Sequence, residues 1–420
     1  MNSQNNSIAG HNNSRRFHYG FIIVACCCLM MGVNIGITFS CAGIFYKPVS
    51  SSLGVSVGEF GLYMSIMYIA STLVLPLGGK LIDRYSARWL LTGSSTVMGL
   101  TLCGMGFCTQ LWQFYLAGAV LGATVAFLLY LSFPTLINRW FRVKVGLLMG
   151  VCSAASGVGG MLFNPIGASV ITNYGWHWAY IGFGLLVLLV DTPLLAILLR
   201  DRPSDMGLQP YGIGEAVRGA AKGPGEPGIM LAQAVRMPAF YGVLLFSFLM
   251  MAMSTLNLFI PNYVTSLSFS LEQGAFAASS AMAGVMVGKL ALGHINDRSC
   301  MAGVLVTTLA GISGLVMMLG GSLGLAIIIS GAFLFGWAYA GVTVQTTMLT
   351  RTVFGIADYA RIYAYMSMAQ AAGGAIASGG WGLLVDATSY PFIFLCGVGM
   401  LAVCTVIGVA AVRRRSGPNI

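Results

Sequence analysis

The sequence EQGAFAASSAMAGVMVGKLALGHINDR, residues Glu272–Arg298, is apolar, rich in small residues and long enough to cross a bilayer as one helix. Its interior carries one full charge, Lys289, eight residues before Asp297. A lysine near the centre of a spanning helix costs about 2.5–3.5 kcal/mol, so such residues usually face a partner or a water-filled cavity. Alternatively, Lys289 could extend back to the headgroups, against the N-terminal tilt of helical side chains.

The composition is that of a multi-span membrane protein. Of 420 residues, 57% are hydrophobic and 8% are charged, whereas soluble chains carry about 25% charged residues. A soluble cytosolic protein is therefore excluded. The net charge of +10 does not indicate nucleic-acid binding, because its placement follows the membrane rule described below. The cysteines form no CxxC pair and the histidines are scattered, so we expect no metal, cofactor or disulfide framework.

Apolar runs of about 20 residues predict an all-α membrane protein with twelve transmembrane helices. The predicted spans are 19–45, 58–81, 88–108, 112–137, 145–172, 178–199, 239–264, 272–295, 301–320, 323–349, 359–384 and 390–412. With the N-terminus inside, every Lys and Arg except Lys47 and Lys289 falls in a cytoplasmic segment. This bias predicts that both termini are cytoplasmic and that the protein is a multi-pass protein of the cell (inner) membrane.

Two halves related in sequence flank a long polar segment. Residues Ser52–Gly61 (SLGVSVGEFG) align with Ser266–Ala275 (SLSFSLEQGA), and at the same offset Gly79–Arg84 (GKLIDR) aligns with Gly293–Arg298 (GHINDR). The repeat predicts two pseudo-symmetric six-helix bundles that rock about a midplane site. The expected parts are a disordered cytoplasmic N-terminal tail (1–18), an N-terminal bundle (19–200), a flexible cytoplasmic linker (201–238), a C-terminal bundle (239–412) and a cytoplasmic C-terminal tail (413–420).

The segment Gly78–Arg88 (GGKLIDRYSAR) resembles the loop between helices 2 and 3 of the major facilitator superfamily. The twelve runs, the central polar segment and the repeat extend this resemblance over nearly the whole chain. It implies the major facilitator fold and a gating latch of the outward-facing state. The predicted gating residues are Asp83, Arg84, Arg88, Asp297 and Arg298. The simpler alternative is that these basic residues only set the orientation in the membrane.

Within that superfamily, Asn138–Pro165, Arg200–Gly212 and Gly175–Tyr180 are similar to the oxalate/formate antiporter and monocarboxylate transporter branch. In that branch a helix 8 arginine binds the substrate carboxylate, and Lys289 stands at the matching position without the bidentate fork. Gln370 replaces a further lysine of the oxalate antiporter, which favours a monoanion. The proton-coupling aspartate of animal monocarboxylate transporters has no counterpart between Glu272 and Asp297.

The same resemblance points to Tyr130 and Tyr339 as cavity aromatics, although core packing is an equal alternative for each. The predicted substrate-binding residues are Lys289, Tyr130, Tyr339, Gln370 and Asn34. Asn34, like Asn164, Asn257 and Gln345, could instead form interhelical hydrogen bonds. Asp191, within helix 6, could carry a proton or accept bonds from backbone freed by Pro193.

We therefore predict a secondary transporter, monomeric by analogy with the family, that moves a small organic anion, in particular a monocarboxylate, with a coupling proton or a counter-substrate. Lys289 would be the counter-charge. The alternatives are an exporter of larger amphipathic or hydrophobic compounds and a membrane sensor that binds the ligand without moving it. A membrane enzyme is disfavoured because the sequence has no nucleotide-binding loop, HExxH motif or catalytic cluster at membrane depth.

Overall fold

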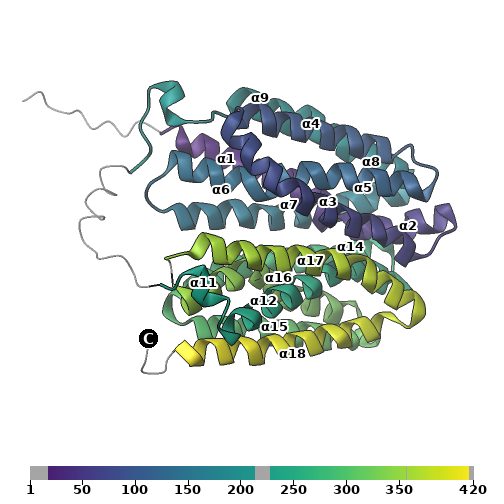
Figure 1. Ribbon diagram of the computed structural model, residues 1–420. Coiled ribbons are helices and arrows are strands. Elements are labelled where there is room, and N and C mark those ends of the chain that lie inside the picture. Colours follow the sequence, from purple (N-terminus) through teal and green to yellow (C-terminus); the bar gives the residue numbers. More distant parts are fainter. Residues whose placement is uncertain (1–17, 213–227, 356, 416–420) are drawn as a thin grey trace, which may run out of the picture.

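The computed structural model describes residues 18–212, 228–355 and 357–415, and these residues fold into helices (Figure 1). Their only β pairing is an isolated bridge between Phe141 and Tyr211. Figure 1 shows the helices of residues 20–198 grouped on one side and those of residues 238–415 on the other. The predicted all-α class is therefore confirmed.

The first group contains α1 (Gly20–Met30), η1 (Met31–Ser40), α2 (Ala42–Leu53), α3 (Val57–Arg84), α4 (Ala87–Met105), α5 (Leu111–Val125), η2 (Ala126–Leu131), α6 (Ser132–Trp140), α7 (Val145–Tyr174), α8 (Trp176–Leu186), η3 (Val187–Asp191) and α9 (Thr192–Leu198). The second contains α12 (Pro238–Ser254), η5 (Thr255–Phe259), α13 (Ile260–Ser266), α14 (Leu271–Arg298), α15 (Cys300–Leu319), η6 (Gly321–Leu323), α16 (Leu325–Phe354), α17 (Tyr359–Ala387) and α18 (Tyr390–Arg415). Between them lie η4 (Pro203–Met206) and α11 (Leu231–Ala234).

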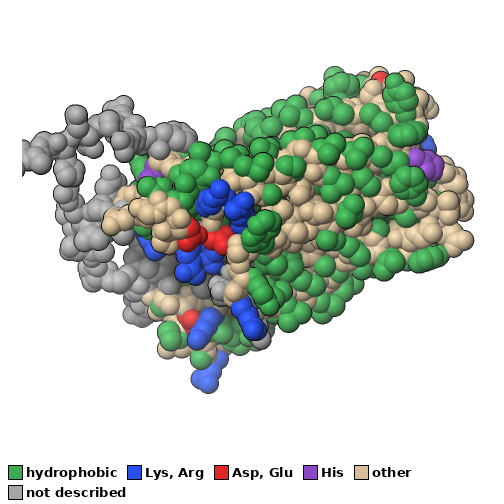
Figure 2. All heavy atoms as spheres, turned by 90° about the horizontal axis from the view of Figure 1, so that it is seen from above, with side chains coloured by type: hydrophobic (Ala, Val, Ile, Leu, Met, Phe, Trp, Pro, Cys, Tyr) green, Lys and Arg blue, Asp and Glu red, His purple; other side chains and the backbone are tan. Residues whose placement is uncertain are grey.

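Among the described residues, 10 helical stretches are long and apolar enough to cross a membrane. Four of these stretches, such as Gly20–Leu53, each run through three of the elements named above. Helices α4 and α17 lie at the predicted spans 88–108 and 359–384 but are not among the ten. Hydrophobic side chains cover the flank of the molecule, whereas Lys and Arg side chains gather toward one end (Figure 2).

The sequence repeat corresponds to two helices with the same length and the same start. Helices α3 and α14 each contain 28 residues. Each begins with a capping box, in which the side chains of the N-cap residue and of the third helical residue bond reciprocally to backbone N–H groups. The boxes are Ser56 with Glu59 and Ser270 with Gln273. Aligned residues therefore begin and end both helices in the same way.

Helix α7 lies between η1 of its own group and α14 of the other, and glycines permit both close approaches. A Cβ atom added at Gly159 would overlap the carbonyl of Gly32 in η1. One added at Gly157 would lie 2.9 Å from the Met282 carbonyl oxygen in α14. Small residues let helix backbones approach in this way in membranes, so α7 links the interior of the first group to the boundary between the groups.

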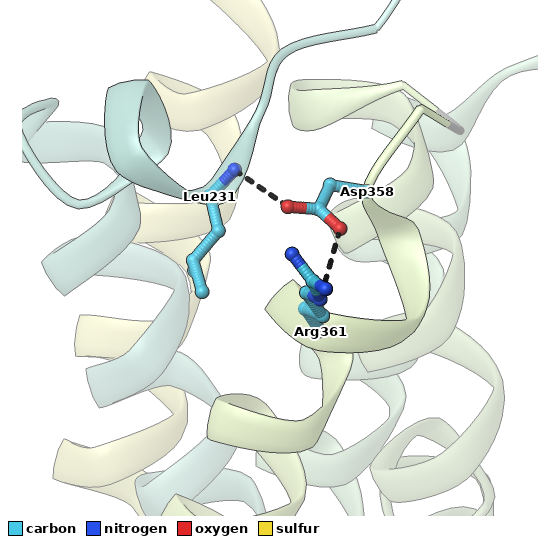
Figure 3. Close-up of polar contacts among 3 residues, drawn as sticks. All are labelled: Leu231, Asp358 and Arg361. Atoms are coloured by element: carbon cyan, nitrogen blue, oxygen red, sulfur yellow. Dashed lines mark hydrogen bonds and ion pairs between the residues drawn. The ribbon is translucent and has the colours of Figure 1, made fainter.

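The two described ends of the polar segment 201–238 are attached to different groups. Tyr211 exchanges backbone hydrogen bonds of 2.9 Å with Trp140 and Arg142 in the first group. At the other end, the Asp358 carboxylate accepts a 3.0 Å bond from the Leu231 N–H and lies 3.6 Å from the Arg361 Nε atom (Figure 3). These contacts hold both ends of the segment. The predicted tails and the centre of the linker fall largely on residues 1–17, 213–227 and 416–420, outside the described part.

We expect the Gly159→Leu substitution to destabilise the protein by about 1–3 kcal/mol or more, because the added side chain meets the backbone of η1. The measurement is the thermal unfolding midpoint in detergent. Gly150→Leu is the matched control on α7, since a Cβ there meets nothing within 4 Å. Equal midpoints for the two variants would contradict the packing argument.

Candidate functional site

Lys289 lies where the two helix groups meet. Its Nζ atom donates to the Ser153 carbonyl oxygen at 2.9 Å, to Ser153 Oγ at 2.9 Å and to Ser156 Oγ at 3.4 Å. Both serines belong to α7, in the first group, whereas Lys289 belongs to α14, in the second. The amine therefore points across the boundary between the groups, toward α7.

This arrangement satisfies the hydrogen bonds of the ammonium but not its charge. An ammonium has three N–H donors, and three oxygen atoms accept from Lys289. All three acceptors are neutral, and no carboxylate is among them. A cation held at membrane depth by neutral oxygens is a suitable partner for an anionic group.

Among the side chains that the structure describes, no other predicted substrate residue is hydrogen bonded to Lys289. Gln370 in α17 donates from Nε2 to the Val342 carbonyl in α16 at 2.6 Å. Tyr339 is half-buried in α16, the helix that packs on α14 beside Gly288 through Trp337. The side chain of Tyr130 lies outside the part that the structure describes.

Asn34 is completely buried and donates from Nδ2 to Asp191 Oδ2 at 2.7 Å. It therefore makes an interhelical bond between η1 and η3 inside the first group. Asp191 also accepts from Ser95 Oγ at 2.8 Å. Its observed partners are thus side chains, and not the backbone freed by Pro193. Asn296 and Gln345 form another interhelical pair, at 3.0 Å.

Helices α3 and α14 finish at Arg84 and Arg298, and we call this end of the molecule the basic end. The end where both helices begin is the opposite end. Hydrogen bonds join the two groups at the opposite end. Asp386 Oδ2 accepts from the Gly58 N–H at 2.9 Å, and Asn262 donates to the Gly43 carbonyl at 3.4 Å. Further along α3, Ser65 Oγ lies 3.0 Å from Ser378 Oγ and accepts from the Gly379 N–H at 2.9 Å.

At the basic end, no hydrogen bond or ion pair between the two groups is seen for the predicted gating residues whose side chains the structure describes, Arg84, Arg88, Asp297 and Arg298. Asp297 and Arg298 are exposed, and the Arg84 guanidinium lies 5.9 Å from the ring of its neighbour Tyr85. Arg88 stays within the first group and donates from Nε to the Ala196 carbonyl at 2.6 Å. The Asp83 side chain is not in the described part. Among the described residues, hydrogen bonds hold the opposite end closed, and the bonds between the groups that lie nearest the basic end are those of Lys289.

Ser153, Ser156, Ser65 and Ser378 were missed by sequence reasoning. Each lies in an apolar run rich in small residues, where serine reads as a packing residue. The Lys289 charge itself indicates that partners exist, because a membrane lysine requires polar acceptors in a neighbouring helix. It does not indicate that α7 is the helix that supplies them.

One pocket in the structure lies elsewhere, inside the first group. It is lined mainly by aromatic and aliphatic side chains, among them Phe45, Tyr63, Tyr180 and Phe183, and by none of the predicted site residues. Its position between η1, α4 and α8, away from the boundary, marks it as a packing void rather than a site shared by the two groups.

Comparisons with known proteins agree with this geometry. Residues 22–346 match the model of the Major Facilitator Superfamily, and the chain belongs to this family, whose members are integral membrane transporters and not enzymes. It is 27% identical over 63% of its length to "Probable transporter MCH2" of Saccharomyces cerevisiae. It is 32% identical over 37% of its length to "Membrane sensor protein UhpC" of Salmonella typhimurium.

The matches span 47% and 35% of these two relatives, so the chain spans about half their length or less. The crystal structure of the nucleoside transporter NupG superposes with a TM-score of 0.73 at 13% identity, and covers 93% of this chain and 99% of NupG. That likeness establishes the fold alone. The comparisons support the superfamily and not a finer branch.

The Ser65→Ala substitution should shift the protein away from the state with a closed opposite end. It removes the bonds of the Ser65 hydroxyl to Ser378 and to the Gly379 N–H, which together contribute about 1–3 kcal/mol. The measurement is the distance between spin labels on Leu77 and Met368, exposed residues nearer the basic end, in a background with the native cysteines replaced. We expect a larger population with a short distance.

Ser71→Ala is the matched control, because the Ser71 hydroxyl bonds only to the Tyr68 carbonyl of its own helix. The same distance distribution in both variants would contradict the role assigned to Ser65.

Proposed function

We propose that this protein is a secondary transporter of a small organic anion, in particular a monocarboxylate, and that Lys289 is the counter-charge for the carboxylate. The observation that carries the proposal is the Lys289 ammonium at the boundary between the helix groups, hydrogen bonded to neutral oxygens only. Membership of a transporter family supports the class of activity.

A carboxylate reaching Lys289 would exchange the neutral Ser153 and Ser156 contacts for a charge-assisted bond, which is shorter and stronger. The bonds that now tie α14 to α7 would be weakened by the same event. Anion binding therefore both neutralises the charge and releases a contact between the groups. In this proposal, loading of the site eases the switch between states.

The charge count favours a monoanion over a dianion. Lys289 presents a point charge, without the planar fork of arginine. Gln370 is neutral and its amide is already bonded to Val342, so it offers no second cation. Tyr339 and Tyr130 remain the proposed cavity aromatics, whereas the Asn34 amide is already bonded to Asp191.

The wider architecture belongs to the same proposal. Twelve helices, with α4 and α17 completing the ten apolar stretches, would form two six-helix bundles in the inner membrane of the cell. The basic end would face the cytoplasm together with both termini, as the positive-inside rule requires. The structure would then be an inward-facing state of a monomer, with the latch of Asp83, Arg84, Arg88, Asp297 and Arg298 released.

A sensor is the second candidate, because one relative carries the name "Membrane sensor protein UhpC". A sensor would bind the anion at Lys289 without moving it. The two candidates differ in one measurable quantity, the flux of labelled anion into sealed proteoliposomes. Binding without flux would favour the sensor.

The Lys289→Gln substitution is expected to reduce exchange of labelled monocarboxylates by about 10–100-fold, since it removes a charge-assisted bond worth about 1.5–3 kcal/mol. The measurement is counterflow in proteoliposomes with a panel of lactate, pyruvate and formate. The control is Lys47→Gln. Besides Lys289, Lys47 is the basic residue that lies outside the predicted cytoplasmic segments. Exchange by a folded Lys289→Gln variant at the wild-type rate would refute the proposal.

The Ser153→Ala substitution should tighten anion binding by about 2–10-fold, because a bond of about 0.5–1.5 kcal/mol to the empty state no longer competes with the anion. The half-saturation concentration for exchange measures this effect. Ser169→Ala, at an exposed position of α7, is the matched control. A weaker or unchanged affinity in Ser153→Ala would show that the serine does not compete with the anion.

A further inference from the structure

A second polar site lies inside the first helix group, around the carboxylate of Asp191. Asp191 is 0% exposed and lies at the end of η3. Its Oδ2 atom accepts from Asn34 Nδ2 of η1 at 2.7 Å and from Ser95 Oγ of α4 at 2.8 Å. Since the Ser95 proton is used in that bond, the Thr192 hydroxyl, 3.0 Å away, donates to Ser95. All bonding to the carboxyl group thus falls on one of its two oxygens.

Among the described residues, the other carboxyl oxygen of Asp191 and the amide oxygen of Asn34 remain without a hydrogen-bond partner. Asp191 Oδ1 and Asn34 Oδ1 are buried and accept no hydrogen bond within the described part of the chain. Each such buried acceptor costs about 1–3 kcal/mol. If Asp191 is ionised, the two orphaned atoms are both acceptors and cannot satisfy one another.

The charged and titratable groups around Asp191 do not compensate an ionised carboxylate. The Cys26 thiol of α1 is a titratable side chain near Asp191, and a thiol cannot supply a positive charge. On α4, Arg88 is bonded instead to the Ala196 carbonyl and, through its backbone N–H, to Asp201 at 2.7 Å. Cys103 bonds to the Ile181 carbonyl. Within the described residues, neither Lys, Arg nor His contacts the Asp191 carboxyl group.

We propose that Asp191 is a proton-binding site, and that its proton sits on Oδ1 and is donated to Asn34 Oδ1. A protonated carboxyl group gains one O–H donor. Together with the existing bond from Asn34 Nδ2 to Asp191 Oδ2, this second bond closes an acid–amide ring. One proton therefore removes the buried charge and satisfies both orphaned oxygens.

The site is connected to Lys289 through close packing. Asn34 belongs to η1, whose Gly32 and Gly36 pack against Gly159 of α7. The same helix supplies Ser153 and Ser156 to Lys289. Irregular π-helical segments such as η1 and η3 are frequent at functional sites. A rearrangement of η1 on α7 would therefore affect both sites.

Resting on the proposed function, the inference adds a coupling ion: one proton on Asp191 moves with one monoanion on Lys289. Asp191 takes the proton from water on one side, forming the Oδ1–H bond, and returns it to water on the other side. In the loaded protein the Lys289 ammonium is then paired with the anion, and the Asp191 carboxyl group is protonated and neutral. Uptake should respond to a pH gradient and not to a membrane potential.

The first test detects the bound proton without any transport. Difference infrared spectroscopy of the purified protein against Asp191→Asn should show a protonated carboxyl band at neutral pH in the wild type and its loss in the variant. Asp205→Asn, an exposed carboxyl, should leave the band unchanged. Should Asp191→Asn fail to fold, Ser95→Ala must shift the band, since it removes a bond to Oδ2. A wild type without the band, or a Ser95→Ala band that does not move, overturns the proton site.

The second test measures coupling in proteoliposomes. We expect an inward-directed proton gradient to stimulate wild-type monocarboxylate uptake several-fold. Asp191→Asn should keep counterflow exchange but lose that stimulation. If the proton gradient stimulates uptake by Asp191→Asn as strongly as uptake by Asp205→Asn, the role of Asp191 in proton coupling is overturned. If the wild type shows no counterflow of any monocarboxylate, the proposed function fails, while the infrared result still decides the proton site.

Discussion

The ammonium of Lys289 is the group around which the rest of the structure must be arranged. A charge at this depth costs a few kcal/mol unless polar atoms surround it, and the oxygens that meet it come from α7, in the other helix group. The cost of one charge is thus offset by contacts that join the two helix groups. Because the acceptors are neutral, this link is weaker than an ion pair, which is the reason that the proposed function assigns an anion to Lys289.

Close packing gives α7 the position that this link requires. Gly157 and Gly159 lie on faces of α7 that meet α14 and η1, and neither face has room for a Cβ atom without displacement. Membrane helices gain little from the hydrophobic effect between them, so contact at this distance is a main source of their association. The helix that binds Lys289 is therefore also the one most tightly held to η1, which carries Asn34.

Much of the fold could be predicted from the sequence, because bilayer thickness, apolar run length and the repeat act locally along the chain. Ser56 and Ser270 were aligned before their role was visible, and both cap helices of equal length. The site was less accessible. Lys289 was identified from its cost alone, but its partners Ser153 and Ser156 are 136 and 133 residues away and have no distinctive spacing. Asn34 and Asp191 are 157 residues apart, and the sequence does not indicate that they pair, because the register between helices depends on tertiary packing.

Lys289 and Asp191 are ionisable groups of opposite sign at membrane depth, and their positions differ. Lys289 lies half-buried at the boundary between the helix groups. In the proposed function an anion binds it there and neutralises its charge. Asp191 lies inside one group, with its partners Asn34 and Ser95 also buried, so only a species as small as a proton can neutralise it without repacking the helices. Under the two proposals, placement relative to the boundary therefore separates the group suited to cargo from the group suited to a coupling ion.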